Sequence, residues 1–186
     1  MDNETDISKV PPVERKLHNF HHVTLVDPTK FEADLTNYLW SKVRNEDYAF
    51  DDLSRDNPTA FCLALVAPQC AHFFLGDPSR PSGWALLKGL WKFSNPDIHF
   101  VVWDKKYPVQ DLKAAGKEVI SWAFQTWQCN RVTAMIPVFN DAARRLAILL
   151  RFQHEGCLKQ AMLFHGRWVN VDMCGLLRED FNTKVI

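Results

Sequence analysis

The sequence has no excess of charge of either sign. Its 186 residues include 22 Lys and Arg and 22 Asp and Glu, so the formal net charge is zero. Proteins that bind nucleic acid by neutralising phosphates usually carry a basic excess or a basic stripe, and neither is visible here. We therefore expect no nucleic-acid partner.

Long apolar runs are also lacking. The run at residues 60–67 is far shorter than the roughly 20 residues that span a bilayer. Residues 1–9 are acidic and polar, whereas a secretory signal is basic and then apolar. We expect no membrane partner and no export, and hence a cytoplasmic location.

Cysteine pairs with the spacing of a structural site are missing as well. The five cysteines are an odd number and form no C-x-x-C pair, which fits neither a disulfide framework nor a zinc knuckle. His21 and His22 are neighbours on an expected strand, where successive side chains face opposite ways. They cannot both bind one ion, so we expect reduced thiols and no metal site.

Apolar and aromatic residues are abundant. The chain is 47% hydrophobic and 12% aromatic, which is enough for the core of a globular domain. Neither an internal repeat nor a long linker divides the sequence. We expect a flexible N-terminus over residues 1–10, a single domain over residues 11–181 and a C-terminal tail over residues 182–186.

Short segments with strand and helix patterns fill the first half. Residues 18–26 are rich in β-branched and aromatic side chains and predict a strand. After Thr29 the apolar residues recur at helical spacing and predict a helix, and a second short helix is expected over residues 47–53. Apolar runs separated by Pro, Gly, Asn and Asp then predict an antiparallel meander. These runs are residues 61–67, 71–75, 84–90 and 98–103.

The second half carries longer patterns. Residues 110–127 have one apolar stripe, which predicts an amphipathic helix leading to a strand at residues 131–138. Asn140 is a typical N-cap for the next helix. Two extended runs, residues 157–164 and 168–177, flank a turn that contains glycine and predict a terminal hairpin.

The order of these later segments resembles the GNAT superfamily of N-acetyltransferases, and most closely its branch that acetylates the N-termini of ribosomal proteins. The resemblance covers about residues 98–180. It rests on a long helix, a strand, a helix headed by Asn140 and ending at Phe152, a Glu-Gly pair and a closing hairpin. The matching segments are residues 121–124, 131–138, 140–152, 155–156, 166–172 and 176–179.

The resemblance implies a mixed α/β (α+β) domain. Its mainly antiparallel sheet would be splayed between strands four and five, flanked by helices and closed by the C-terminal hairpin. Acetyl-CoA would lie in the splay, with its pantetheine along strand four (residues 98–103) and its pyrophosphate at the loop of residues 104–110 and the helix that follows. The implied activity is transfer of acetyl from acetyl-CoA to an amine.

The resemblance also implies which residues would bind the cofactor. They belong to strand four, to the loop after it and to the cap of the later helix. These residues are Val101, Val102, Trp103, Lys105, Lys106, Val109, Gln110 and Asn140. For Asn140 two roles remain open, a contact with CoA and a simple N-cap.

Asp97 and His99 are the candidates for a general base. Both lie near the start of strand four, and histidine has a suitable intrinsic pKa for accepting a proton from an amine. The alternative is that Asp97 is a turn residue at the end of the strand and that His99 is an ordinary surface or half-buried histidine.

The sequence departs from the family pattern at the pyrophosphate loop. Residues 107–112 contain no glycine, Pro108 lacks an N–H donor, and Asp111 places a carboxylate where phosphate would lie. Lys105 and Lys106 compensate only by charge.

The general acid of the family is also not evident. Alanine stands at positions 143 and 147, where branches of the family have a serine and a tyrosine, so no group is evident for protonating the departing thiolate. We expect acetyl transfer to be weak or lost.

Two functions therefore remain open. One is an acetyl-CoA-dependent N-acetyltransferase with an amine acceptor. The other is a non-catalytic binding or structural module with the GNAT fold and a protein partner, for example a component of a bacteriophage virion or of its assembly. Either protein could form a homo-oligomer or a heteromeric assembly, and fold alone does not decide between them.

Overall fold

The computed structural model describes residues 20–26, 33–44, 46, 49, 57–67, 69–90 and 94–182. The expected flexible residues 1–10 lie outside this part of the chain. The same holds for the helix expected over residues 47–53, apart from Ala49, and for the expected tail beyond Asn182.

The centre of the fold is a seven-stranded sheet with the strand order β1-β2-β3-β4-β5-β7-β6. Neighbouring strands are antiparallel except for β4 and β5, which are parallel. This confirms the mixed, mainly antiparallel fold class. The strands are β1 (Val23–Val26), β2 (Cys70–Leu75), β3 (Gly83–Lys88), β4 (Asp97–Val102), β5 (Arg131–Pro137), β6 (Gln153–Phe164) and β7 (Arg167–Leu177).

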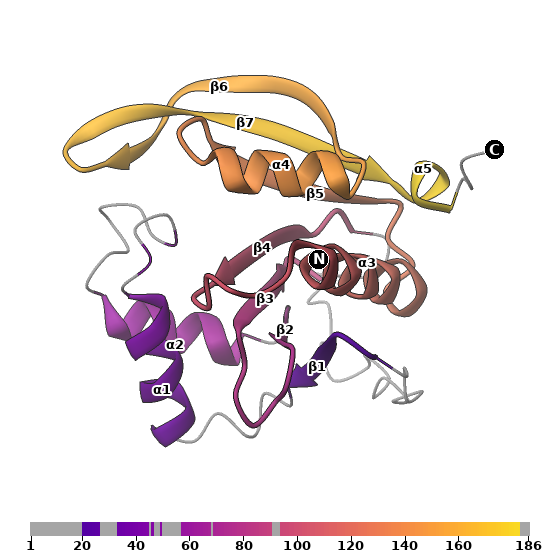
Figure 1. Cartoon of the computed structure of the whole chain (residues 1–186). Helices are drawn as coiled ribbons and strands as arrows, with labels where there is room; N and C mark the ends of the chain where they lie inside the picture. Colours follow the sequence, from indigo (N-terminus) through magenta and orange to yellow (C-terminus); the bar gives the residue numbers. More distant parts are fainter. Residues whose placement is uncertain are drawn as a thin grey trace, which may run out of the picture.

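Helices cover both faces of this sheet (Figure 1). Phe73 and Leu75 of β2 pack in one core cluster with residues of α3 and α4, whereas Phe74 between them packs in a second cluster with residues of α1 and α2. The alternation of a strand thus supplies two apolar layers. The helices are α1 (Ala33–Val43), α2 (Pro58–Val66), α3 (Val109–Thr126), α4 (Asp141–Leu149) and α5 (Arg178–Asn182).

The strand expected at residues 61–67 is wrong, because residues 61–66 belong to α2 and Ala67 is its C-cap. The Asn57 side chain accepts a hydrogen bond from the Ala60 N–H at 3.0 Å, and Pro58 occupies the first turn, so a cap and a proline start a helix here. A short apolar run by itself fits a buried strand and a buried helix equally well. The residues that indicate a helix here, Asn57 and Pro58, precede the run.

The other expected elements of the second half are confirmed within a few residues. Asn140 is the N-cap of α4, since its Oδ1 accepts a hydrogen bond from the Ala143 N–H at 3.0 Å. The far end of α4 packs closely on α3, where a β-carbon at Gly116 would lie 2.8 Å from Cδ1 of Leu150. This close approach fixes the two helices beside β5.

The terminal hairpin of β6 and β7 is also confirmed. Register shifts interrupt its pairing between His154 and Gly156 and between Leu158 and Met162. β6 forms one edge of the sheet and is largely exposed. In Figure 1 the turn of the hairpin extends beyond β5 and α4. None of the described helices is long and apolar enough to cross a membrane.

Candidate functional site

β4 and β5 pair only at one end. Their register contains a single residue pair, Asp97 with Thr133, beside which the Thr133 N–H donates to the Pro96 carbonyl at 2.9 Å. Beyond that bridge the two strands diverge (Figure 1). The sheet is therefore splayed between its fourth and fifth strands, as expected.

The splay opens into a cavity of about 370 Å³, a size typical of small-ligand sites. Its walls come from β4, β5, α4 and the segment that joins β4 to α3. The lining residues are Ala49, Ile98, His99, Phe100, Val101, Val102, Asp104, Lys105, Tyr107, Leu112, Ala134, Met135, Ile136, Pro137, Asn140, Ala142, Ala143, Leu146, Ala147, Leu150 and Phe152.

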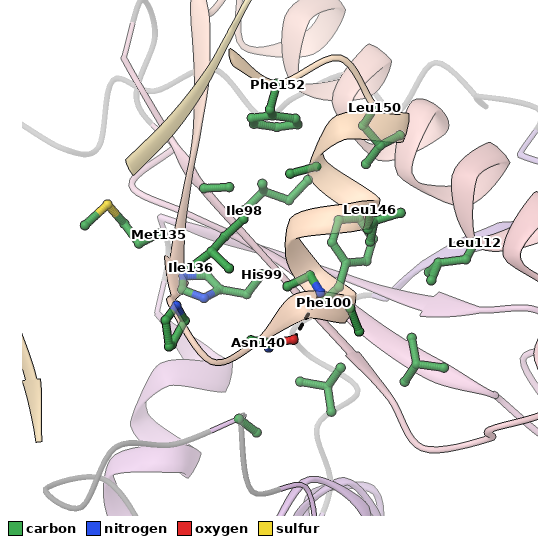
Figure 2. Close-up of a pocket in the computed structure, with 18 of the residues that line it drawn as sticks. Ile98, His99, Phe100, Leu112, Met135, Ile136, Asn140, Leu146, Leu150 and Phe152 are labelled. Atoms are coloured by element: carbon green, nitrogen blue, oxygen red, sulfur yellow. Dashed lines mark hydrogen bonds between the residues drawn. The ribbon is translucent and has the colours of Figure 1, made fainter. Parts of the chain in front are cut away.

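The cavity has a mouth and a closed end. Since α4 follows β5 and runs back beside it, Asn140 stands at the open end of the splay and Leu150 near the end where the strands pair. Figure 2 shows Asn140 and Phe152 at opposite ends, with Ile136, Leu146 and Ile98 between them.

The edge of β4 that faces the opening offers backbone hydrogen-bonding groups. The Trp103 N–H donates to the Ser82 carbonyl of the β3 side at 3.1 Å. Because bonded and non-bonded pairs alternate in an antiparallel ladder, Phe100, opposite Ala85, directs its N–H and C=O away from β3. In the described part of the chain no bridge joins Phe100 to β5, so this edge can pair with an extended ligand.

The N-terminus of α3 lies at the mouth. Its first helical hydrogen bond runs from the Leu112 N–H to the Pro108 carbonyl at 3.0 Å, and no side chain caps the helix. The N–H groups of Val109, Gln110 and Asp111 therefore have no partner within the helix. Such N–H groups, together with the helix dipole, favour an anion.

Lysine side chains flank this helix end. Lys106 is exposed and belongs to no ion pair among the described residues. Nζ of Lys105, in contrast, lies 2.6 Å from Oε2 of Glu46 and 3.4 Å from the Val102 carbonyl oxygen. The two lysines are thus not equivalent, because a carboxylate already neutralises one of them.

Asp111 is turned toward β1. Its carboxylate oxygen lies 3.9 Å from Nδ1 of His22, and the residue is absent from the cavity wall. The same side of α3 carries Glu118, whose carboxylate accepts the N–H groups of His21 and His22 at 3.1 and 3.0 Å. The Asp111 charge therefore faces a histidine rather than the cavity.

His99 lies in the cavity wall on the face of β4 that also carries Val101. The side chain is exposed at the cavity, and the atoms packed around it remove part of the solvation of the ring. This loss of solvation, with a smaller contribution from the positive charge of Lys88, lowers the pKa of His99 from 6.5 to about 4. The imidazole is neutral at pH 7 and can accept a proton.

Asp97 lies at the closed end, in the bridge to Thr133, and is not part of the wall. Partial burial raises the pKa of its carboxyl, and the charge of Lys88, opposite it on β3, opposes the shift. Of the two base candidates, the structure places only His99 on the cavity.

The expected cofactor-binding residues separate into two groups. Val101, Val102, Lys105 and Asn140 line the cavity. Val109 and Gln110, in the first turn of α3, and Lys106, in the loop before it, lie outside the cavity wall.

Trp103 points elsewhere. Its indole N–H donates to the Pro81 carbonyl at 2.7 Å, and its ring meets Tyr38 of α1 edge to face, with centroids 6.4 Å apart. The Trp103 side chain therefore belongs to the apolar cluster under α1 and α2 and is not directed at the cavity.

A chain of polar side chains crosses β5 next to the bridge, and the sequence did not reveal it. The Thr133 hydroxyl donates to Oδ1 of Asn95 at 2.8 Å and accepts from Nε of Arg131 at 3.1 Å. The guanidinium of Arg131 then binds both carboxylate oxygens of Glu155. This chain stiffens the closed end of the splay, because it ties the loop before β4 to β6 across β5 and β7.

The described residues fit the coenzyme that the family resemblance implies. Coenzyme A is a flexible amide-containing arm with a pyrophosphate at one end. The site pairs an apolar slot, edged by the backbone of Phe100, with the N–H groups of α3 and with Lys106 at its mouth. When bound there, the coenzyme supplies an activated acyl thioester.

Comparison with known proteins supports this description of the fold. The sequence matches no family model and no curated relative. Solved structures do match. A probable acetyltransferase has a TM-score of 0.66 and 16% identity, over 86% of this chain and 95% of that chain. Spermidine N-acetyltransferase from Vibrio cholerae, solved with CoA and spermine, has a TM-score of 0.69 and 13% identity, over 87% of this chain and 99% of that chain.

The chain has the GNAT fold. The mainly antiparallel sheet with its one parallel pair, β4 and β5, and the helices that flank it match that fold, whereas the low identity leaves the chemistry to be argued from the residues present. Among the described residues, no group of three or more His, Cys, Asp and Glu side chains is placed to hold a metal ion.

Proposed function

We propose that this chain binds an acyl-CoA in the cavity between β4 and β5 and transfers the acyl group to a primary amine. One observation carries the proposal: the slot between the diverging strands continues, at its mouth, into the uncapped N-terminus of α3. An apolar slot with an anion site at one end suits the pantetheine arm and pyrophosphate of CoA.

The binding roles follow from this geometry. The backbone of Phe100 pairs with the amides of the arm, and the N–H groups of Val109, Gln110 and Asp111 hold the pyrophosphate with help from Lys106. The degraded glycine loop then weakens binding without abolishing it, because these contacts need no glycine. Asn140 stands at the mouth, where its amide N–H₂ can reach the ligand while its Oδ1 caps α4.

Proton transfer is the weak part of the site. His99 accepts a proton from the attacking amine, but with a pKa of about 4 it is a poor base for that step. For the departing thiolate, the acid candidates of the described wall are poor ones: the Tyr107 hydroxyl has no hydrogen-bond partner but is enclosed, burial raises its pKa further, and Lys105 is held by Glu46. Because acid–base catalysis contributes about 10²–10⁴-fold, we expect slow turnover that depends on positioning.

The acceptor is best assigned by charge. The described cavity lining contains one carboxylate, Asp104, and one ammonium, Lys105, so it has no net negative charge to complement a polyamine. The Vibrio cholerae neighbour is a spermidine N-acetyltransferase, whereas the motif order of this chain resembles the branch that acetylates ribosomal-protein N-termini. We therefore propose a protein or peptide α-amino group as the acceptor.

A non-catalytic module is the second candidate. The observation that favours it is that the described cavity wall offers no accessible general acid, since the Tyr107 hydroxyl is enclosed and its pKa is raised by burial. Such a module would keep the fold and bind a protein partner without releasing CoA. A component of a bacteriophage virion is an example of such a module.

Calorimetry with acetyl-CoA and a thiol-release assay test both candidates. We expect a micromolar Kd and slow CoA release that needs a peptide α-amine and not spermidine. Ala143→Phe, which fills the mouth beside α4, should abolish binding, and the same change at exposed Ala161 of β6 should not. Absence of binding by the wild-type chain would refute the proposal, and binding without release would support the module.

A further inference from the structure

We infer that the face of β5, β7 and β6 turned away from α4 docks an acceptor polypeptide whose second to fourth residues are apolar. The inference rests on the proposed function and specifies the acceptor. This surface, called the open face below, consists of apolar side chains that belong to neither core cluster of the described residues. They are Met135, Leu158, Met162, Val169, Val171 and Met173.

The alternation of β5 separates Met135 from the core. Ala134 and Ile136 pack in the core cluster that includes residues of α3 and α4, so Met135 between them points to the other face. Figure 2 shows Met135 on the side of β5 away from Leu146 and Leu150 of α4.

The register extends this face across the hairpin. Residues directly opposite one another on paired strands share a face. The pairs that share a face with Met135 run from β5 to β7 and from β7 to β6. They are Met135 with Met173, Pro137 with Val171, Val171 with Leu158, and Val169 with Met162.

The helices α1 and α2 cover the same side of the sheet over its first four strands. The cluster they form contains residues of β1, β2, β3 and β4, and in the described part of the chain none of β5, β7 or β6. The side chains of the open face remain half-buried for the most part, and Leu158 is 43% exposed. A contiguous apolar surface of this kind is typical of a binding site.

The open face continues into the cavity. Met135 and Pro137 belong to both, because they also line the cavity beside His99. The bridge of the parallel strands pairs Asp97 with Thr133. Two residues further along each strand stand His99 and Met135, so both lie on this side of the sheet. An amine that gives its proton to His99 approaches from the open face, and the polypeptide behind the amine lies over it.

The width of the open face sets how many acceptor residues it contacts. Neighbouring strands lie about 4.8 Å apart, and an extended chain advances about 3.3 Å per residue. Three residues are therefore enough to cross from β5 over β7 to β6. The second to fourth residues of the acceptor then pass Met135, Met173 and Leu158 in turn.

The composition of the open face selects apolar acceptor residues. The positions of β7 on this face, residues 169, 171, 173, 175 and 177, are Val, Val, Met, Gly and Leu. The charged side chains of Arg131 and Glu155 bind each other and so do not attract a charged peptide. A polar side chain over this surface would lose hydration without gaining a hydrogen bond. The flexible side chains of Met135 and Met173 can adapt to different apolar residues.

The test compares three peptides with the same N-terminal alanine and the same soluble C-terminal tail. Their second to fourth residues are Leu-Val-Leu, Ser-Thr-Ser and Leu-Val-Lys. Thiol release at saturating acetyl-CoA gives kcat/KM for each peptide, and the anisotropy of a dye on the tail gives its Kd in the presence of CoA. We expect kcat/KM to be at least roughly tenfold higher for the Leu-Val-Leu peptide than for the Ser-Thr-Ser peptide, from the burial of apolar side chains.

Two variants assign the preference to the open face. Leu158→Glu should reverse the order of the Leu-Val-Leu and Leu-Val-Lys peptides, because the new carboxylate meets the fourth residue. Ile148→Glu puts the same charge on an exposed apolar residue of α4, on the other side of the sheet, and should keep the wild-type order. An unchanged Kd for CoA shows that each variant is folded. If Leu158→Glu does not fold, the wild-type peptide series decides alone.

The outcomes separate this inference from the proposed function. Equal constants for the Leu-Val-Leu and Ser-Thr-Ser peptides, in a chain that binds CoA, overturn the docking surface and leave the proposed CoA site in place. A wild-type order in folded Leu158→Glu does the same. If CoA binds and no peptide is acetylated, the Kd values of the peptides decide in the same way. No binding of CoA overturns the proposed function, and this inference with it.

Discussion

The guanidinium of Arg131 lies against the backbone of Gly175, in space that a side chain at residue 175 would need. Gly175 of β7 is paired with Thr133 of β5, whose hydroxyl accepts from Arg131. The lack of a side chain on β7 thus allows the arginine to reach Glu155 across the neighbouring strand.

Gly175→Ala should displace this arginine. A methyl group there would push the flexible guanidinium away from Glu155 and Thr133 and lower the free energy of unfolding by about 1 kcal/mol, the value of a partly exposed ion pair with its hydrogen bonds. Denaturant unfolding measures the loss. Gly156→Ala is the control, since nothing lies within 4 Å of its β-carbon and its φ is not positive; an equal loss in both variants would contradict the steric explanation.

Gly83→Ala should be more damaging. A β-carbon at Gly83 would lie 2.6 Å from the Val101 carbonyl oxygen and 2.7 Å from Cδ1 of Leu75. The carbonyl belongs to the central strand β4 and cannot rotate away. We expect loss of about 2–4 kcal/mol, in the range of severe core substitutions, or failure to fold. A variant with wild-type stability would show that β3 and β4 can separate at this point.

Lowering the pH from 6.5 to 4 should destabilise the protein through His99. The folded-state pKa of His99 is about 4, below its unfolded value of 6.5, so the unfolded chain binds the proton more tightly in this window. The contribution of His99 to the free energy of unfolding is therefore fully present above pH 6.5 and is lost as the pH is lowered toward 4. Because the cavity admits water to the ring, the loss is smaller than the full shift would give.

His99→Gln is the matched variant for this pH dependence. Its free energy of unfolding, measured by denaturant titration at several pH values, should vary less between pH 6.5 and 4 than that of the wild type. Parallel curves for the two proteins would contradict the low pKa.

Glu46→Gln should strengthen the binding of CoA. Glu46 is largely buried and neutralises Lys105, whose side chain is otherwise well exposed beside the mouth. Loss of the carboxylate frees that ammonium for the pyrophosphate, and we expect the Kd to fall several-fold at low salt and less at high salt, because exposed charges are screened. Lys106→Met should raise the Kd. Calorimetry at two salt concentrations measures both, and an unchanged Kd in Glu46→Gln would contradict competition for Lys105.

Local patterns explain how much of this fold the sequence could predict. The apolar stripe of residues 110–127, the cap at Asn140 and the glycine turn of the hairpin each act within a few residues, and each led to the observed element. The strand expected at residues 61–67 failed because its apolar run has no periodicity that separates strand from helix.

The candidate site was less accessible to sequence reasoning. Val101, Val102, Lys105 and Asn140, which line the cavity, were expected from the family resemblance, whereas the wall on β5 and the end of α4 depend on how far two strands diverge. No local pattern encodes that separation. The direction of the Asp111 side chain toward His22 is a similar case. His22 directly precedes β1, which is far from Asp111 in the sequence, so no local pattern indicates this contact.

The single bridge between Asp97 and Thr133 has a consequence for how the protein unfolds. Four strands on one side and three on the other share one residue pair, so the hydrogen-bonded sheet is nearly two sheets. A ligand paired with the edge of β4 would supply part of the ladder that the chain itself leaves out. Binding should then slow amide exchange in both sets of strands. The free protein would unfold as two cooperative units, and the bound protein as one.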